Sequence, residues 1–188
     1  MCKRIFKDQT TLTGDIPFYK IGTFGKEPDA YISKEIYDEF RNKYSFPKKG
    51  DILISASGTI GRRVKYDGKP AYFQDSNIVW IDNDETQVLN DYLYYFYETC
   101  NWNSTKGATI SRLYTTNLQQ LEIAFPKSLP EQQRIVSLLD ETFAGLAQVH
   151  ANAERNLVNA REVFGSYLES LFADSRSGWE EKKLGEVC

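Results

Sequence analysis

The chain has 188 residues, of which 41% are hydrophobic and 14% aromatic, a composition typical of folded proteins and not of disordered ones. Its three cysteines are far apart without a CxxC pair, and no apolar run approaches the roughly 18 residues that span a bilayer. These features argue against a disulfide scaffold, a zinc site and a membrane protein. The basic residues Lys3 and Arg4 precede no apolar stretch of the kind found in a secretory signal, so we expect a soluble cytoplasmic protein.

The formal net charge of −3 hides an uneven distribution of charge. Segment 41–69 contains eight basic residues against two acids, whereas segment 70–105 contains six acids and no Lys or Arg. A basic band inside an otherwise near-neutral domain favours contact with phosphates. The alternative is a solvated face on which the charges cluster by chance. The basic band consists of Arg41, Lys43, Lys48, Lys49, Arg62, Arg63, Lys65 and Lys69.

Residues 1–127 are predicted to form short strands, turns and a few short helices. Alternating or β-branched runs bounded by turn residues predict strands at 16–21, 51–55, 64–66, 71–73, 77–81 and 122–125. The dipeptide Asp67-Gly68 between two of these runs is typical of a tight hairpin turn. Helical segments are expected at 33–40, 88–99 and 116–121. The aromatic run inside the second helix is more typical of a core than of a ligand site.

A long helix is predicted from Ser128 to residue 174. Ser128 and Glu131 match a capping box, Pro130 lies in the first turn, and no proline follows. Apolar or small residues then recur at alternating spacings of three and four, the coiled-coil period. A rod of roughly 60 Å at 1.5 Å per residue needs a partner helix, although it can also lie on its own domain. The stripe consists of Leu139, Phe143, Leu146, His150, Ala153, Leu157, Ala160, Phe164, Tyr167 and Leu171.

Several segments resemble type I restriction–modification specificity subunits. Segment 129–136 reads LPEQQRIV and, with the heptad helix after it, is similar to the spacer region of that family. Segment 50–61 reads GDILISASGTIG and resembles part of the family's target recognition domains. Segment 14–21 resembles the strand that opens such domains, and segment 113–126 resembles the run that leads into the spacer. The matches cover nearly the whole chain in the right order.

The resemblance implies a modular, non-catalytic protein that recognises double-stranded DNA. In this family two recognition domains each read one half of a bipartite target, and two long antiparallel helices fix the gap between them. The specificity subunit binds methylation and restriction subunits, which carry the catalysis. This chain would supply one recognition domain (1–127), one spacer and dimerisation helix (128–174) and a tail (175–188). The expected class is α+β: a β-rich mixed recognition domain followed by one long coiled-coil-forming helix.

The tail carries a second resemblance. Segment 178–188 is similar to the opening strand of a recognition domain, and Met1–Ile5 is similar to the residues that come next in such a domain. A circularly permuted half subunit, or a fragment cut from a longer one, would have this order. We therefore expect a homodimer with antiparallel long helices, in which each tail docks on a recognition domain, most simply that of the partner. The expected dimerisation residues are Trp179 and the stripe defined above.

Two polar, basic segments are the candidate DNA contacts. Short hydroxyls and backbone N–H groups suit phosphates, whereas arginine suits either a phosphate or a guanine edge. Simple surface exposure is the alternative for each residue. The candidates are Lys20, Ser57, Thr59, Arg62, Arg63, Lys65, Lys106, Thr109, Ser111, Arg112 and Tyr114.

Enzymatic alternatives lack their motifs. The sequence contains no Asn-Pro-Pro-Tyr loop of an amino-methyltransferase and no GxxxxGK[ST] phosphate loop. Pro28-Asp29 and Glu180-Glu181-Lys182 lie too far apart to predict a nuclease site, and His150 is the only histidine. We expect no catalytic residue, metal or cofactor. A non-catalytic coiled-coil adaptor whose β-rich domain binds protein remains the alternative, but it offers no reason for the basic band.

Overall fold

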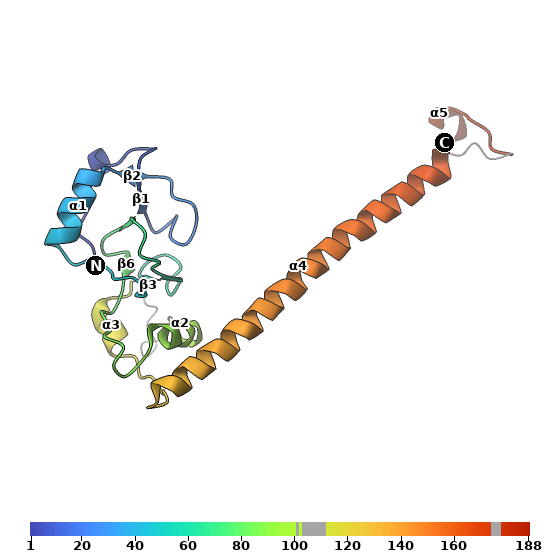
Figure 1. Ribbon diagram of the computed structural model, residues 1–188. Coiled ribbons are helices and arrows are strands. Elements are labelled where there is room, and N and C mark those ends of the chain that lie inside the picture. The colour runs from blue at the N-terminus through green and yellow to red at the C-terminus, as the bar shows by residue number, and fades with distance from the viewer. Residues whose placement is uncertain (101, 103–111, 174–177) are drawn as a thin grey trace. The chain divides into compact units, whose positions relative to one another are not determined.

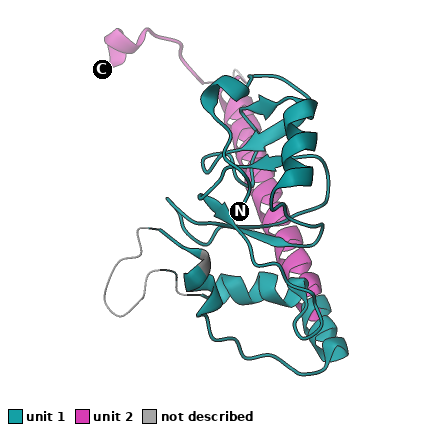
Figure 2. Ribbon diagram, turned by 90° about the vertical axis from the view of Figure 1, so that its left-hand side faces the viewer, with its two compact units in different colours: residues 1–137 teal, residues 138–188 magenta. Residues whose placement is uncertain are grey.

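The computed structural model describes residues 1–100, 102, 112–173 and 178–188 (Figure 1). The chain divides into two compact units, residues 1–137 and 138–188, with the boundary inside the long helix (Figure 2). The expected α+β class is confirmed. The strands of the described residues are β1 (Ile16–Tyr19), β2 (Tyr31–Ile32), β3 (Ile52–Ser55), β4 (Arg63–Lys65), β5 (Tyr72–Phe73) and β6 (Ile78–Val79). The helical elements are η1 (Lys7–Gln9), α1 (Lys34–Lys43), α2 (Asn90–Thr99), α3 (Thr115–Gln119), α4 (Leu129–Ala173) and α5 (Leu184–Val187).

Unit 1 contains two small sheets, ordered β2-β1-β5 and β4-β3-β6. In the first sheet β1 is antiparallel to β2 and parallel to β5, with Phe18 opposite Tyr72. In the second sheet β3 is antiparallel to both neighbours, with Leu53 opposite Val64 and Ile54 opposite Val79. Strand β3 is therefore hydrogen-bonded along both edges.

The sheet around β3 separates two hydrophobic clusters. Leu53 packs in the first cluster, with the β1 and β5 aromatics and with Tyr37 of α1. Ile52 and Ile54 pack in the second cluster, with Tyr97 of α2 and with α3. Successive side chains of a strand point to opposite faces, so these assignments place apolar groups on both faces of β3. Every residue of β3 is at most 3% exposed.

The hairpin predicted at Asp67-Gly68 is wrong. β4 pairs with β3 and β5 pairs with β1, so the turn carries the chain from one sheet to the other. Side-chain bonds close the turn instead of a ladder: the Tyr66 hydroxyl donates to the Lys69 carbonyl (2.7 Å) and the Lys69 N–H donates to Asp67 Oδ1 (2.9 Å). Pro70 follows directly and has no N–H to donate to a neighbouring strand.

The strand predicted at 122–125 is also wrong, since these residues lie outside the helices and strands. Backbone carbonyls near this segment accept hydrogen bonds from side chains and not from a strand. The Tyr92 hydroxyl donates to the Ala124 carbonyl (3.1 Å), and Gln132 Nε2 donates to the Pro126 carbonyl (2.7 Å). The remaining predicted strands and helices are present with shifted ends.

Helix α4 begins in unit 1, where Gln132 fixes its first turn. The side chain of Gln132 is fully buried. Its Oε1 accepts from the Leu89 N–H (2.9 Å), and its Nε2 donates to the carbonyls of Gln87 (2.8 Å) and Pro126 (2.7 Å). From Asp140 to Ala173 nearly every side chain is exposed. Within the part of the chain that the structure describes, no helix combines the length and apolarity needed to cross a membrane.

Replacing Gln132 should destabilise unit 1. In Gln132→Leu the Leu89 N–H and two carbonyls lose their partners inside the protein, and each buried unpaired polar group costs about 1–3 kcal/mol. We expect urea unfolding, followed by tryptophan fluorescence, to show a free energy of unfolding lower by at least about 1–3 kcal/mol. The control is Gln133→Leu, which makes the same change at the exposed neighbouring position. Equal stability of the two variants would contradict the role given to Gln132.

Candidate nucleic-acid interface

The loop at residues 56–61, between β3 and β4, is held by the buried hydroxyl of Ser55. This hydroxyl donates to the Thr59 carbonyl (2.6 Å) and accepts from the Arg62 N–H (2.8 Å). The Gly61 N–H adds a bond to the Ser55 carbonyl (3.1 Å). These bonds fold the loop back on itself and leave Gly58 and Thr59 exposed at its tip.

Gly61 cannot be replaced without disturbing this loop. Its φ of +88° lies in the left-handed region that residues other than glycine rarely adopt. A Cβ added there would lie 2.1 Å from Trp102 Nε1. The glycine therefore permits both the turn and the close approach of the indole ring. The last position of segment 50–61, the segment that resembles the family's target recognition domains, therefore requires a glycine.

Three segments that are far apart in the sequence meet beside this loop. The Leu113 N–H donates to the Ala56 carbonyl (2.8 Å). Arg112 Nη2 donates to the Ser76 carbonyl (2.8 Å) and to Asn77 Oδ1 (3.1 Å), which also accepts from the Ser57 hydroxyl (2.9 Å). We call Ser57, Ser76, Asn77 and Arg112 the polar cluster. The two candidate segments predicted from the sequence are thus brought together, with a third that the sequence did not indicate.

The turn that carries Ser76 and Asn77 has an uncommon backbone. Ser76 has a φ of 59°, a left-handed conformation that is rare outside glycine. Beside it, the Asp75 carboxylate pairs with Arg4 (3.0 Å) and accepts from the Ser76 hydroxyl (3.2 Å). The acid next to the polar cluster is thereby neutralised within the unit, so it presents less repulsion to an approaching anion.

The polar cluster is rich in hydrogen-bond donors. Asn77 Oδ1 is occupied by two donors, and the amide nitrogen has no partner among the described residues. Arg112 uses one of its two terminal nitrogens in the bonds given above, although a guanidinium has five N–H groups. Tyr114 follows at 59% exposure. Asn and Arg are side chains that read base edges, and hydroxyls and aromatic rings add phosphate and base contacts.

Arg62 and Arg63 are bound within the protein. Arg62 Nη1 donates to the Phe24 carbonyl (2.8 Å). Arg63 pairs with Glu98, lies over the Tyr94 ring at 4.4 Å from its centroid, and has a side chain only 16% exposed. Removing either side chain would therefore change the packing as well as the charge.

The other predicted contacts differ in their surroundings. Lys20 pairs with Asp29 (2.8 Å) and Lys65 pairs with Asp91. Lys106, Thr109 and Ser111 lie outside the described residues. Sequence reasoning missed Ser76 and Asn77, because Asn77 was assigned to the start of a strand. The only sequence signal was the polar run at 75–77, which is typical of a turn.

Carboxylates of segment 70–105, which we call the acidic stretch, neutralise part of the basic band. Lys48 pairs with Asp82 (2.8 Å), and as described above Lys65 and Arg63 also take carboxylate partners from segment 70–105. In the Lys48 pair both side chains are more than 70% exposed. Exposed pairs of this kind contribute about 0–1 kcal/mol, so a phosphate can replace the carboxylate at little cost.

Unit 2 presents an apolar surface along α4. Within the predicted stripe Phe143, Leu146, Leu157 and Phe164 are 52–63% exposed, whereas Leu139 and Leu171 are half-buried. His150 lies 3.6 Å from Glu154 on the same exposed helix. Exposed apolar side chains also occur outside the stripe, and the prediction missed them: Leu138, Val149, Val158, Val163, Leu168 and Phe172.

The tail of unit 2 differs from the strand that its sequence resembles. Leu184–Val187 form the short helix α5. The Trp179 ring packs against Phe172, with centroids 6.2 Å apart, and Trp179 is 54% exposed.

Comparison with known proteins gives a consistent result. Residues 1–159 match the family model described as type I restriction modification DNA specificity domain. A Haemophilus influenzae protein, provisionally named a type I restriction enzyme specificity subunit, is 67% identical over 141 residues, which cover 75% of this chain and 36% of that protein. A solved chain from work on complex assembly and conformational transition of the type I R-M system has a TM-score of 0.62 at 22% identity. That match covers 86% of this chain and 40% of the solved chain. This chain thus spans well under half the length of either protein.

Proposed function

The chain belongs to the type I restriction modification DNA specificity domain family, and from this premise we propose that it is the DNA-recognition part of a type I restriction–modification system. It reads one half of a bipartite target, scaffolds the methylation and restriction subunits, and leaves catalysis to them. The polar cluster carries this proposal. It joins three polar segments at one place on unit 1, where an arginine and an asparagine keep donors available.

Within this proposal Asn77, Arg112 and Tyr114 contact bases, while loop 56–61, which includes Ser57, contacts phosphates. The exposed tip of that loop, at Gly58 and Thr59, lets backbone and hydroxyl groups approach the DNA backbone closely. Lys20 and Lys65, together with the arginines at 62 and 63, are proposed phosphate contacts that exchange their partners inside the protein for phosphate oxygens.

Arg112→Gln should weaken sequence-specific binding. A lost bidentate base contact costs about 1–3 kcal/mol, or roughly ten- to hundredfold in affinity for the cognate duplex, and should relax discrimination at one position. The measurement is fluorescence anisotropy with a duplex selected from a randomised library. Lys127→Gln removes the same charge from an exposed position of unit 1 and serves as the control. Thermal melting checks folding, because Arg112 also bonds Ser76.

Two outcomes would contradict the proposal in different ways. Unchanged affinity and discrimination in Arg112→Gln would remove Arg112 from the base contacts. Absence of any duplex binding by the unaltered protein, with or without its partner subunits, would favour the alternative of a coiled-coil adaptor whose β-rich domain binds protein.

We also propose that α4 pairs with a second copy of itself in a homodimer. The exposed stripe supports this, since large apolar side chains at coiled-coil spacing are otherwise left in water. An antiparallel pair is two-fold symmetric and presents two recognition units, one for each half of a bipartite target. Val149, Val158 and Val163 lie outside the two-helix seam, and they support contact with a further partner, for which we propose the methylation subunit.

Leu157→Glu should disrupt the dimer. It places a charge in the middle of the apolar seam, where a partner helix would bury it without a counter-ion. We expect sedimentation at micromolar concentration to show a dimer for the unaltered chain and a monomer for this variant. Asn159→Glu adds the same charge two residues away, on the opposite side of the helix, and should remain dimeric. An unaltered chain that sediments as a monomer would refute the pairing.

We propose that residues 178–188 of the tail dock on unit 1 of the partner copy. Trp179, Leu184 and Val187 are 54–77% exposed, and they would act as apolar anchors once buried. Deletion of residues 178–188 should lower the melting temperature of unit 1, while sedimentation should still show a dimer. A deletion variant with an unchanged melting temperature would indicate that the tail does not dock.

A further inference from the structure

Two turns lie at the end of strand β3 that is opposite loop 56–61. The Gly50 N–H donates to the Tyr66 carbonyl and the Tyr66 N–H donates to the Asp51 carbonyl, both at 2.9 Å. The buried carboxylate of Asp51 accepts from the Lys48 N–H (2.8 Å). The turn at 48–50 and the turn at 66–69 are therefore fixed side by side.

These two turns border a cavity of about 600 Å³ whose lining includes four basic side chains. Among the residues that the structure describes, Asp67 is the only acidic one in its lining. We call this cavity the cationic pocket. Its basic residues form half of the basic band, and none of them is in the polar cluster: Arg41, Lys48, Lys49 and Lys69.

Two of these cations are positioned without a carboxylate. The Arg41 guanidinium lies over the rings of Tyr37 and Phe46, 5.7 and 5.8 Å from their centroids. Lys49 lies along Gly68, where an added Cβ would approach the Lys49 Cβ to 3.1 Å. Neither Arg41 nor Lys49 has an ion-pair partner among the described residues. The rings contact the Arg41 guanidinium and the glycine contacts the aliphatic part of Lys49, and neither contact uses an N–H group in a hydrogen bond.

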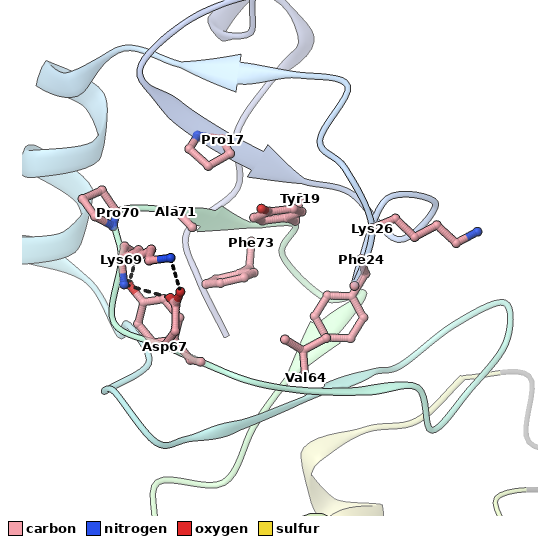
Figure 3. A pocket seen from close by; sticks show the side chains of 12 residues that line it. Pro17, Tyr19, Phe24, Lys26, Val64, Asp67, Lys69, Pro70, Ala71 and Phe73 are labelled. Atoms are coloured by element: carbon pink, nitrogen blue, oxygen red, sulfur yellow. Dashed lines mark hydrogen bonds and ion pairs between the residues drawn. The ribbon is translucent and has the colours of Figure 1, made fainter. Parts of the chain in front are cut away.

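The other two cations have weak partners. Lys48 pairs with the exposed Asp82, and Lys69 lies 3.5 Å from Asp67 (Figure 3). The backbone N–H of Lys69 holds the pKa of the Asp67 carboxyl below its usual value, so this acid stays charged and the pocket keeps an excess of positive charge. The same turn borders an aromatic cavity of about 340 Å³ lined by Tyr19 and Phe73, which offers mainly apolar surface to an anion (Figure 3).

We propose that the cationic pocket binds a phosphate group. The phosphate comes either from the DNA backbone, a case that rests on the function proposed above, or from a small phosphate such as a mononucleotide. The length of β3, about 10 Å at 3.3 Å per residue, separates this pocket from loop 56–61. A phosphate bound in this pocket and a phosphate bound at the loop would therefore be two different phosphates of the duplex.

The first arm of the test uses inorganic phosphate and adenosine monophosphate as probes on the full chain. Amide NMR at constant ionic strength compares phosphate with chloride. We expect the signals of Gly50 and Gly68 to shift in a saturable manner in the unaltered protein and in Lys127→Gln. In Lys49→Gln the affinity should fall at least several-fold. Lys49 is exposed and makes no described hydrogen bond, so this variant should fold.

The second arm measures the salt dependence of duplex binding. If the pocket contacts DNA, Lys49→Gln should lower the slope of log affinity against log salt by about 0.9 while leaving the preference for the cognate sequence unchanged. A saturable phosphate shift with an unchanged slope would support the pocket with a small phosphate as its ligand. If Lys49→Gln changes neither the phosphate shifts nor the slope, the proposal is overturned. If the unaltered protein binds no duplex but still shows a saturable phosphate shift, the proposed function is refuted and phosphate binding by the pocket is supported.

Discussion

The burial of β3 on both faces determines where the candidate sites of unit 1 lie. Leu53 packs into one hydrophobic cluster and Ile54 into the other, so a slip of the strand by one residue would move each side chain into the opposite cluster and disrupt the packing of both. Its edges are also occupied, by β4 and β6. The two ends of such a strand are rigid attachment points. One end holds loop 56–61 through the Ser55 hydroxyl, and the other holds the turn at 48–50 through the Asp51 carboxylate.

Charge is distributed by the same arrangement. Strand β4 lies beside β3 and contacts α2, which brings Arg63 and Lys65 to Glu98 and Asp91. The basic band therefore loses part of its field to the acidic stretch, and its open positive charge is concentrated at the cationic pocket. The cations with exposed carboxylate partners can still exchange them for phosphate, and Arg63 can do so while it stays packed against Tyr94. Net charge along the sequence is thus a poor guide to the potential at a given site.

Local patterns predicted the parts of the fold that depend on local chemistry. Helix α4 follows from its apolar period and loop 56–61 from its glycines, and the resemblance to a known family located both. Pairings between distant segments were not predictable in this way. The Asp67-Gly68 turn looks like a hairpin locally, but β5 pairs with β1, more than 50 residues away. The bond from Arg112 to Asn77 and the bonds that join Gln132 to Gln87 and Leu89 likewise connect residues between 35 and 45 positions apart. No periodicity in the sequence encodes which of several polar residues will meet.

The two units differ in how far they bury their apolar side chains. Unit 1 buries most of its large apolar side chains in two clusters, but α4 beyond Ser137 leaves residues such as Leu157 and Phe164 more than half exposed. Isolated helices gain little stability from propensity alone, and most of it comes from packing an apolar face. Burial contributes roughly 25 cal/mol per Å² of apolar surface, so pairing would stabilise the helix as well as join two copies. In the proposed homodimer, helix formation and association would then be one equilibrium. Gln132 ties the first turn of that helix to unit 1, so recognition of the proposed bipartite target would be a property of the assembled pair and not of either copy.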